Sequence, residues 1–232
     1  SSDLAKLHLC DSTWARIDNA RAIVDHIVAQ GERAYGISTG LGALSDVMLQ
    51  GPQLAQLSRN TLLSHACGVG APLTVEQTRA IMCAAVNNYA HGHSGISRSV
   101  VEALIALLNL DITPSVPSQG SVGYLTHMAH IGVALLGFGE VMWQGRPMLA
   151  MQALREVGMA PLELRAKDGL SLVNGTPCMT GLACLGLADA FNLAEWADII
   201  GVMSFEALRG QIDAFDRSEE RRVGKECMER VD

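Results

Sequence analysis

Residues 114–140 read "PSVPSQGSVGYLTHMAHIGVALLGFGE", and the character of the chain changes in the middle of this stretch. The first part is rich in Pro, Ser and Gly, which is typical of a loop. The second part carries apolar residues three and four positions apart and predicts a helix over about residues 124–137. A polar loop that leads into an apolar helix is a common setting for functional groups, because the helix gives the loop a rigid support.

The same helical pattern extends over most of the chain. Only 4% of the residues are aromatic, and Ala, Leu, Met and Glu recur at helical spacing, so we predict an all-α fold. Thr74 and Gln77 form the pattern of a capping box ahead of one of these helices. The other predicted helices cover about residues 13–30 (with Thr13 as the cap), 53–67, 98–109, 148–157 and 179–208, and the glycine-rich stretch 169–177 is expected to be a loop.

Composition excludes several classes of partner. The formal net charge is −7, and no run of Lys and Arg precedes the last sixteen residues, which argues against nucleic acid. The most apolar stretch, residues 131–136, is too short to span a bilayer, and the first residues lack the pattern of a signal peptide. The six cysteines form no CxxC pair and suit a reducing environment. We therefore expect a cytoplasmic protein that binds neither nucleic acid nor membrane.

The last sixteen residues, 217–232, read "RSEERRVGKECMERVD" and differ from everything before them. They are charged and have almost no apolar face, which is typical of a solvated tail. They also resemble the translation of sequencing-adapter DNA joined to a truncated reading frame. We therefore expect one domain over residues 1–216 and assign no function to 217–232.

Several glycine-marked motifs stand in a fixed order along the chain. They are "YGISTGLGAL" (35–44), "LLSHACGVGAPL" (62–73), "PSQGSVG" (117–123), "GLSLVNGTP" (169–177) and "FEALRG" (205–210). Together they resemble the N-terminal part of the aromatic amino acid ammonia-lyase family, which includes histidine, phenylalanine and tyrosine ammonia-lyases and related aminomutases. The resemblance runs from about residue 35 to residue 216.

The resemblance implies a mainly α, helical bundle domain with glycine-rich active-site loops, usually in a homotetramer. It implies a carbon–nitrogen lyase that eliminates ammonia without oxidation from a small-molecule aromatic amino acid, leaving an α,β-unsaturated acid. In this family the electrophilic cofactor is a methylidene-imidazolone, formed when an Ala-Ser-Gly tripeptide of the chain cyclises. The resemblance implies no metal.

The resemblance also assigns roles to individual residues. Tyr35 would be the catalytic base, which requires a lowered phenol pKa. Asn174 would hydrogen-bond the electrophile or the region of the substrate carboxylate. Ser64 and His65 would contact the substrate ring, and this Ser-His pair occurs in histidine-specific members, while Gly42 would belong to the substrate-binding loop.

The cofactor segment departs from the family pattern. Gly120, Ser121, Val122 and Gly123 match the residues before the tripeptide, but Tyr124 follows directly and Ala-Ser-Gly is absent. Either the gene lacks the tripeptide, or the matured group was dropped from a sequence written in standard letters. The family's Asp and Pro after the tripeptide are also replaced, by Tyr124 and His127, and this favours a real absence.

Two other functions fit the residues. The chain could be a catalytically inactive homologue, a binding or oligomer-partner subunit that kept the pocket and lost the electrophile. It could also bind a metal through His127 and His130, or through His91 and His93, as helical i,i+3 or neighbouring pairs. No carboxylate or cysteine stands nearby at ligand spacing, so packing in the core or at an interface is the simpler interpretation of these histidines.

Overall fold

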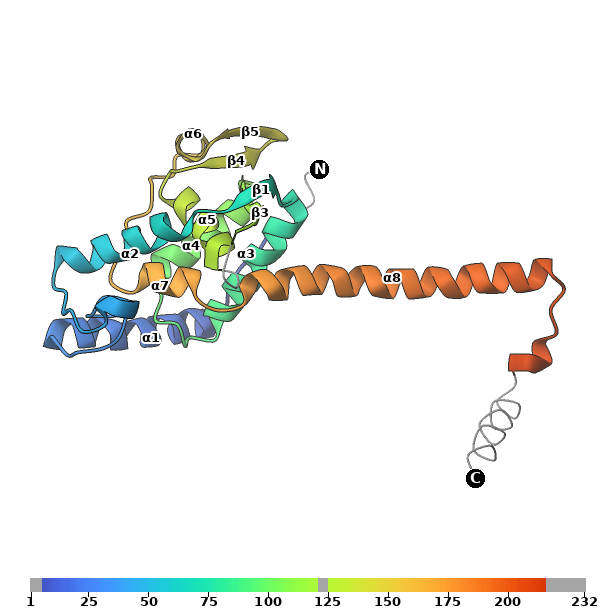
Figure 1. Cartoon of the computed structure of the whole chain (residues 1–232), viewed down its shortest axis with the longest axis horizontal. Helices are drawn as coiled ribbons and strands as arrows, with labels where there is room; N and C mark the ends of the chain where they lie inside the picture. Colours follow the sequence, from blue (N-terminus) through green and yellow to red (C-terminus); the bar gives the residue numbers. More distant parts are fainter. Residues whose placement is uncertain (1–5, 121–124, 216–232) are drawn as a thin grey trace, which may run out of the picture. The chain divides into compact units, whose positions relative to one another are not determined.

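The computed structural model describes residues 6–120 and 125–215 of the chain. The chain divides into two compact units, Ser1–Leu185 and Gly186–Asp232. The first unit is mainly helical, with small antiparallel sheets between the helices (Figure 1). The prediction of a mainly α fold is confirmed.

The helices are α1 (Asp11–Gln30), α2 (Pro52–His65), α3 (Val75–Ala90), α4 (Arg98–Asn109), α5 (Leu125–Leu135), α6 (Ala150–Glu156), α7 (Asp168–Val173) and α8 (Pro177–Ala207). Two 3₁₀ turns, η1 (Gly42–Leu44) and η2 (Ile212–Phe215), lie outside them. The strands are β1 (Val69–Pro72), β2 (Thr113–Pro114), β3 (Pro117–Gln119), β4 (Glu140–Trp143) and β5 (Arg146–Leu149).

Local sequence signals placed several helix ends correctly. Thr74 caps α3 as predicted: its side chain accepts from the Gln77 amide, and the Gln77 side chain accepts from the Thr74 amide. Helix α4 has the predicted bounds. The cap of α1 was predicted wrongly, because Cys10 is the N-cap and Thr13 lies inside the helix, where its hydroxyl contacts the Cys10 thiol.

The five short strands of the described residues were not predicted, and one predicted loop is a helix. β4 and β5 form a hairpin in the segment expected to be a polar connection, with Trp143 paired to Arg146. The two turn residues, Gln144 and Gly145, both have positive φ, which matches the twist of a two-residue hairpin turn. The stretch 169–173, expected to be loop, is helical and forms most of α7.

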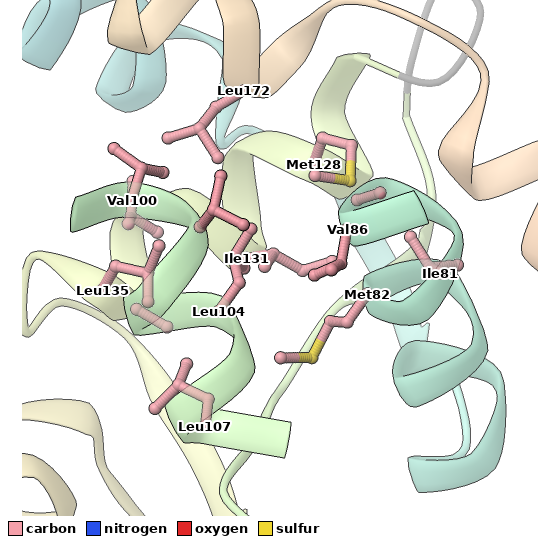
Figure 2. Packing of buried hydrophobic residues seen from close by; sticks show 14 of the residues in the cluster. Ile81, Met82, Val86, Val100, Leu104, Leu107, Met128, Ile131, Leu135 and Leu172 are labelled. Carbon is pink, nitrogen blue, oxygen red and sulfur yellow. The ribbon is translucent and has the colours of Figure 1, made fainter. Parts of the chain in front are cut away.

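The core of the first unit lies where α3, α4 and α5 meet, and Leu172 of α7 closes it (Figure 2). Each helix contributes a stripe of fully buried side chains: Ile81, Met82 and Val86 from α3, Val100, Leu104 and Leu107 from α4, and Met128, Ile131 and Leu135 from α5. Burying one such side chain contributes about 1.5–3 kcal/mol. This core holds the supports of the candidate site in place.

A buried carboxylate, that of Asp168, fixes the start of α7. Its oxygens accept from the Ser97 amide (2.9 Å), the Ser97 hydroxyl (2.8 Å) and the Arg165 amide (2.8 Å). The Arg21 guanidinium of α1 lies 3.2 Å away and also donates to the Ala166 carbonyl (2.9 Å). Burial raises the pKa of the Asp168 carboxyl, and the amide donors and Arg21 act in the opposite direction. The cluster joins α1, the start of α4 and α7.

The second unit begins within α8. From residue 187 onward, this helix exposes large apolar side chains that include Phe191, Trp196 and Ile200. By length and composition alone, the segment Asp168–Ala207 is apolar enough to cross a membrane, a property that core helices of soluble proteins share. A helix that is apolar on all sides is stable in water only when another surface covers it.

We expect Asp168→Asn to lower the free energy of unfolding by about 3–5 kcal/mol, because it removes the only fully buried carboxylate that pairs with the Arg21 guanidinium in the described structure and leaves only the partly exposed Asp25 as its counter-charge. The matched control is Asp25→Asn. Asp25 also pairs with Arg21 (2.9 Å), but its side chain is 40% exposed, so the loss should stay below about 1 kcal/mol. Urea unfolding followed by circular dichroism measures both, and equal losses would contradict the role given to Asp168.

Candidate active site

Tyr35 lies in the loop after α1, with its side chain 60% exposed and its hydroxyl turned back onto the chain. The phenolic oxygen accepts a hydrogen bond from the Gly42 amide at 3.2 Å. This hydrogen bond ties the end of the Tyr35 side chain to the backbone of the same loop. The structure thus brings together two residues assigned to the site from the sequence, Tyr35 and Gly42.

The loop itself is held firmly. Ser38 and Thr39 are buried, and the Ser38 hydroxyl donates to the Glu32 carbonyl and accepts from the Ala34 amide. Gly36 has a φ of +66°, and a Cβ at this position would lie 2.3 Å from a methyl group of Leu170 in α7. The loop therefore docks on Leu170 of α7, and Gly36 adopts there a left-handed backbone conformation that glycine favours.

Ser64 and His65 form the C-terminal end of α2. The His65 Nδ1 atom lies 2.8 Å from the Thr61 carbonyl oxygen, and the Ser64 hydroxyl lies 3.1 Å from the same nitrogen. Because a carbonyl can only accept, Nδ1 carries the proton, and Nε2 of the neutral ring is an acceptor. His65 is half-buried, so this acceptor can meet a ligand.

The segment after α2 packs tightly against the residues that lead to the cofactor position. A Cβ on Gly120, whose φ is +108°, would lie 3.2 Å from the Gly68 Cα. The Gly68 amide donates to Nε2 of His130 in α5 at 3.1 Å. β1 and β3 pair beside this contact, with Val69 opposite Gln119. Close backbone approach thus connects the end of α2 to Gly120 and α5.

Asn174 caps the C-terminal end of α7 and is exposed. It lines a pocket of about 300 Å³ together with Asn88, His91, His93, Ser94, Lys167, Ser171 and Gly175. Among the described residues, this lining includes none of Tyr35, Ser64 and His65. Sequence reasoning missed Lys167 as a neighbour of Asn174, because it stands seven residues earlier and reaches the pocket only through the turn of α7.

Lys167 is the cation of this pocket. Its ammonium donates to the Ser94 carbonyl and to the Ser171 hydroxyl. Burial lowers the pKa of Lys167, the nearby Arg21 cation lowers it further, and Asp168 opposes both. The pocket therefore offers amide, imidazole and ammonium groups, a set suited to an anionic group such as a carboxylate.

A frame of three helices supports all of these groups. α2 packs against α5 and α7, and α5 packs against α7. Gly169 of α7 lies so close to α2 that a Cβ would be 2.1 Å from the Ser58 carbonyl oxygen, and a Cβ on Gly132 of α5 would lie 2.9 Å from the methyl groups of Leu62. Tyr35 docks on α7, Asn174 ends α7, and His65 ends α2, so the candidate residues share one rigid support.

The chain does not fit the methylidene-imidazolone of the related lyases. The described residues do not include Ser121, Val122, Gly123 and Tyr124. No Ala-Ser-Gly occurs anywhere in the 232 residues. The described residues on either side of this segment are in contact, since the Thr126 hydroxyl donates to the Gly120 carbonyl at 3.3 Å.

The metal hypothesis gains no support from the described residues, which contain no group of three or more His, Cys, Asp or Glu side chains placed to hold an ion. His130 uses Nε2 to accept from the Gly68 amide. His91 and His93 line the Asn174 pocket instead. The structure thus gives most of these histidines a role as hydrogen-bonding or lining groups.

Comparison with known proteins identifies a family for this architecture. The family model described as "Aromatic amino acid lyase" matches residues 1–222. The histidine ammonia-lyase of Geobacillus thermodenitrificans is 45% identical over 203 residues, which cover 86% of this chain and 40% of that enzyme.

Solved structures agree with the sequence relatives. Histidine ammonia-lyase from Trypanosoma cruzi matches with a TM-score of 0.89 at 35% identity, covering 94% of this chain and 43% of that one. The ergothioneine-degrading enzyme ergothionase from Treponema denticola matches with a TM-score of 0.87 at 29% identity, covering 94% and 44%. The chain thus spans less than half the length of the relatives it matches.

We expect stability to depend on pH through His130. Burial, and then the nearby His127, lower the pKa of His130 below its usual 6.5. The unfolded chain therefore takes up a proton before the folded chain does, and this contribution to stability is present above pH 6.5 and lost as pH falls through the folded pKa.

The variant His130→Gln keeps an acceptor for the Gly68 amide and cannot titrate. Its free energy of unfolding, measured in urea at pH 7.5 and pH 5, should fall less than that of the original chain. His8→Gln, at an exposed position, should retain the original dependence. An unchanged dependence in His130→Gln would show that His130 does not contribute.

Proposed function

This chain belongs to the aromatic amino acid lyase family, and we propose that it forms part of a carbon–nitrogen lyase that cleaves the Cα–N bond of an aromatic amino acid without oxidation. The products are the released amine, ammonia in the related ammonia-lyases, and an α,β-unsaturated acid. The observation that carries the proposal is the shared support of Tyr35, His65 and Asn174 on the frame of α2, α5 and α7.

Tyr35 is the group that takes the proton from Cβ. It is exposed enough to reach a ligand, and the hydrogen bond from the Gly42 amide fixes the position of its phenolic oxygen. The buried Ser38 and Thr39 keep the loop in one conformation, so the oxygen is held in position before the substrate arrives.

His65 selects the ring. Its Nε2 is an acceptor, which suits the N–H of an imidazole and offers nothing to a plain phenyl ring. The similarity to histidine ammonia-lyases supports the same preference, so we propose a histidine-like substrate. Asn174, beside the ammonium of Lys167, binds the carboxylate end of the substrate.

The methylidene-imidazolone of the family supplies, when present, the electrophile that activates the amine. The sequence contains no Ala-Ser-Gly from which this group forms. This absence is also the observation that favours the alternative, an inactive subunit that binds a ligand. The retained Tyr35 loop, with its buried Ser38 and Thr39, favours elimination, because a binding subunit has no need of a placed base.

The full-length protein is proposed to be a homotetramer in the cytoplasm. The exposed apolar side chains of α8, including Phe191, Trp196 and Ile200, form a surface that a partner must cover. A second copy of the chain satisfies this requirement. The domain boundary near residue 216, with 217–232 outside the domain, stays a prediction.

To test this function, the full-length protein is incubated with amino acids that carry imidazole, phenyl or phenol rings. Each is supplied with a free and with a methylated amine, so that the ring preference is measured apart from the leaving group. Ultraviolet absorbance of the unsaturated acid reports elimination, and the imidazole substrates should react fastest. No unsaturated acid from any member of the panel would leave the binding subunit as the explanation.

We expect Tyr35→Phe to lower kcat by about 10²–10⁴-fold, because the variant removes the base and keeps the shape of the side chain. The matched control is Tyr89→Phe. Tyr89 is fully buried, and its hydroxyl donates to the Ser171 carbonyl at 3.2 Å, so its loss should cost about 1 kcal/mol of stability and leave kcat nearly unchanged. Similar kcat values for the Tyr35→Phe variant and the original enzyme would exclude Tyr35 as the base.

A further inference from the structure

Compared with the pattern of the family, the sequence lacks the tripeptide that forms the electrophile and has the other residues of the candidate site. Ala-Ser-Gly is missing from all 232 residues, while Tyr35, Ser64, His65 and Asn174 are present. The surrounding fold forms without the tripeptide: β1 pairs with β3, Gly68 packs on Gly120, and the Thr126 hydroxyl bonds to the Gly120 carbonyl. An elimination in this site must therefore use a substrate that needs no activation of its nitrogen.

A primary amine is unsuited to such a site. The N–H protons of an ammonium group are far more acidic than a Cβ proton, so a base strong enough to attack Cβ removes an N–H proton first. The product is a neutral amine, which would have to leave as an amide anion. Side chains of ordinary residues are poor electrophiles and do not change this.

A quaternary nitrogen avoids the problem. It has no N–H proton, so the base can only take the proton from Cβ, and the nitrogen keeps its positive charge throughout. As the Cβ–H bond breaks, its electrons form the Cα–Cβ double bond, and the electrons of the Cα–N bond leave with a neutral trialkylamine. The proton ends on Tyr35, and no oxidant, reductant or acid is required.

We propose that the natural substrate is a betaine, an aromatic amino acid whose α-nitrogen carries three alkyl groups. Its ring is an imidazole, as proposed from the acceptor Nε2 of His65. This inference rests on the proposed function, since it names the leaving group of the same elimination. The roles proposed above for Tyr35, Ser64, His65 and Asn174 are toward the Cβ proton, the ring and the carboxylate, so none of them requires an N–H on the substrate nitrogen.

The test compares L-histidine with its Nα-trimethyl betaine on the full-length protein. The unsaturated acid is followed by ultraviolet absorbance, and trimethylamine and ammonia are measured separately. We expect kcat/KM for the betaine to exceed that for L-histidine by at least about 100-fold, and Tyr35→Phe to abolish trimethylamine release. Ammonia release from L-histidine at a comparable or higher rate would overturn the betaine and leave the proposed function standing.

Product from neither compound, together with none from the wider ring panel, would instead overturn the proposed function itself. Mass spectrometry of the peptide that spans residues 120–130 provides an independent measurement. The mass expected is that of the unmodified printed sequence. The additional mass of a dehydrated Ala-Ser-Gly would show that the electrophile is present and would overturn the inference.

Discussion

The position of the candidate site depends on the carboxylate of Asp168. Removing this charge from water carries a large desolvation cost, and only the Ser97 amide and hydroxyl, the Arg165 amide and the Arg21 guanidinium together offset it. These donors come from separate segments of the chain, so the charge is satisfied only when α1, the start of α4 and α7 stand in one arrangement. That arrangement fixes the position of α7. Leu170 of this helix contacts the Tyr35 loop, and Asn174 caps its C-terminal end.

Close contacts at glycine residues connect α7 to α2 and to the Tyr35 loop. Gly169 lies against the Ser58 carbonyl of α2, and Gly36 lies against Leu170. At Gly169 a side chain would push α7 and α2 apart, and at Gly36 the positive φ favours glycine, so the glycines of the sequence motifs serve packing as well as loop conformation. The motifs therefore combine two functions: they carry polar groups, and they set the distances between the helices that hold those groups.

The sequence predicted most of the helices because their signals are local. The capping box at Thr74 and the apolar spacing of residues 98–109 need no knowledge of the fold. α7 was missed because its six residues contain Gly169 and are stabilised by the tertiary contacts of Asp168, and the β4–β5 hairpin was missed because Gln144-Gly145 is a weak turn signal. The motifs pointed to Tyr35, His65 and Asn174, whose roles stay predictions. The Lys167 neighbour of Asn174 arises only from the folded chain.

Tyr35, the proposed base, and the segment that carries the electrophile in the related lyases have separate supports in this chain. Tyr35 is held by its own buried loop and by Leu170 of α7, whereas the segment that would carry the electrophile runs between β3 and α5. A deletion in that segment leaves the contacts of the Tyr35 loop intact. On the proposed mechanism, proton abstraction at Cβ and departure of the amine are therefore separable: Tyr35 would perform the first, and a substrate whose nitrogen is already quaternary would supply the second. A change of substrate can thus follow from the loss of three residues, without any change in the base.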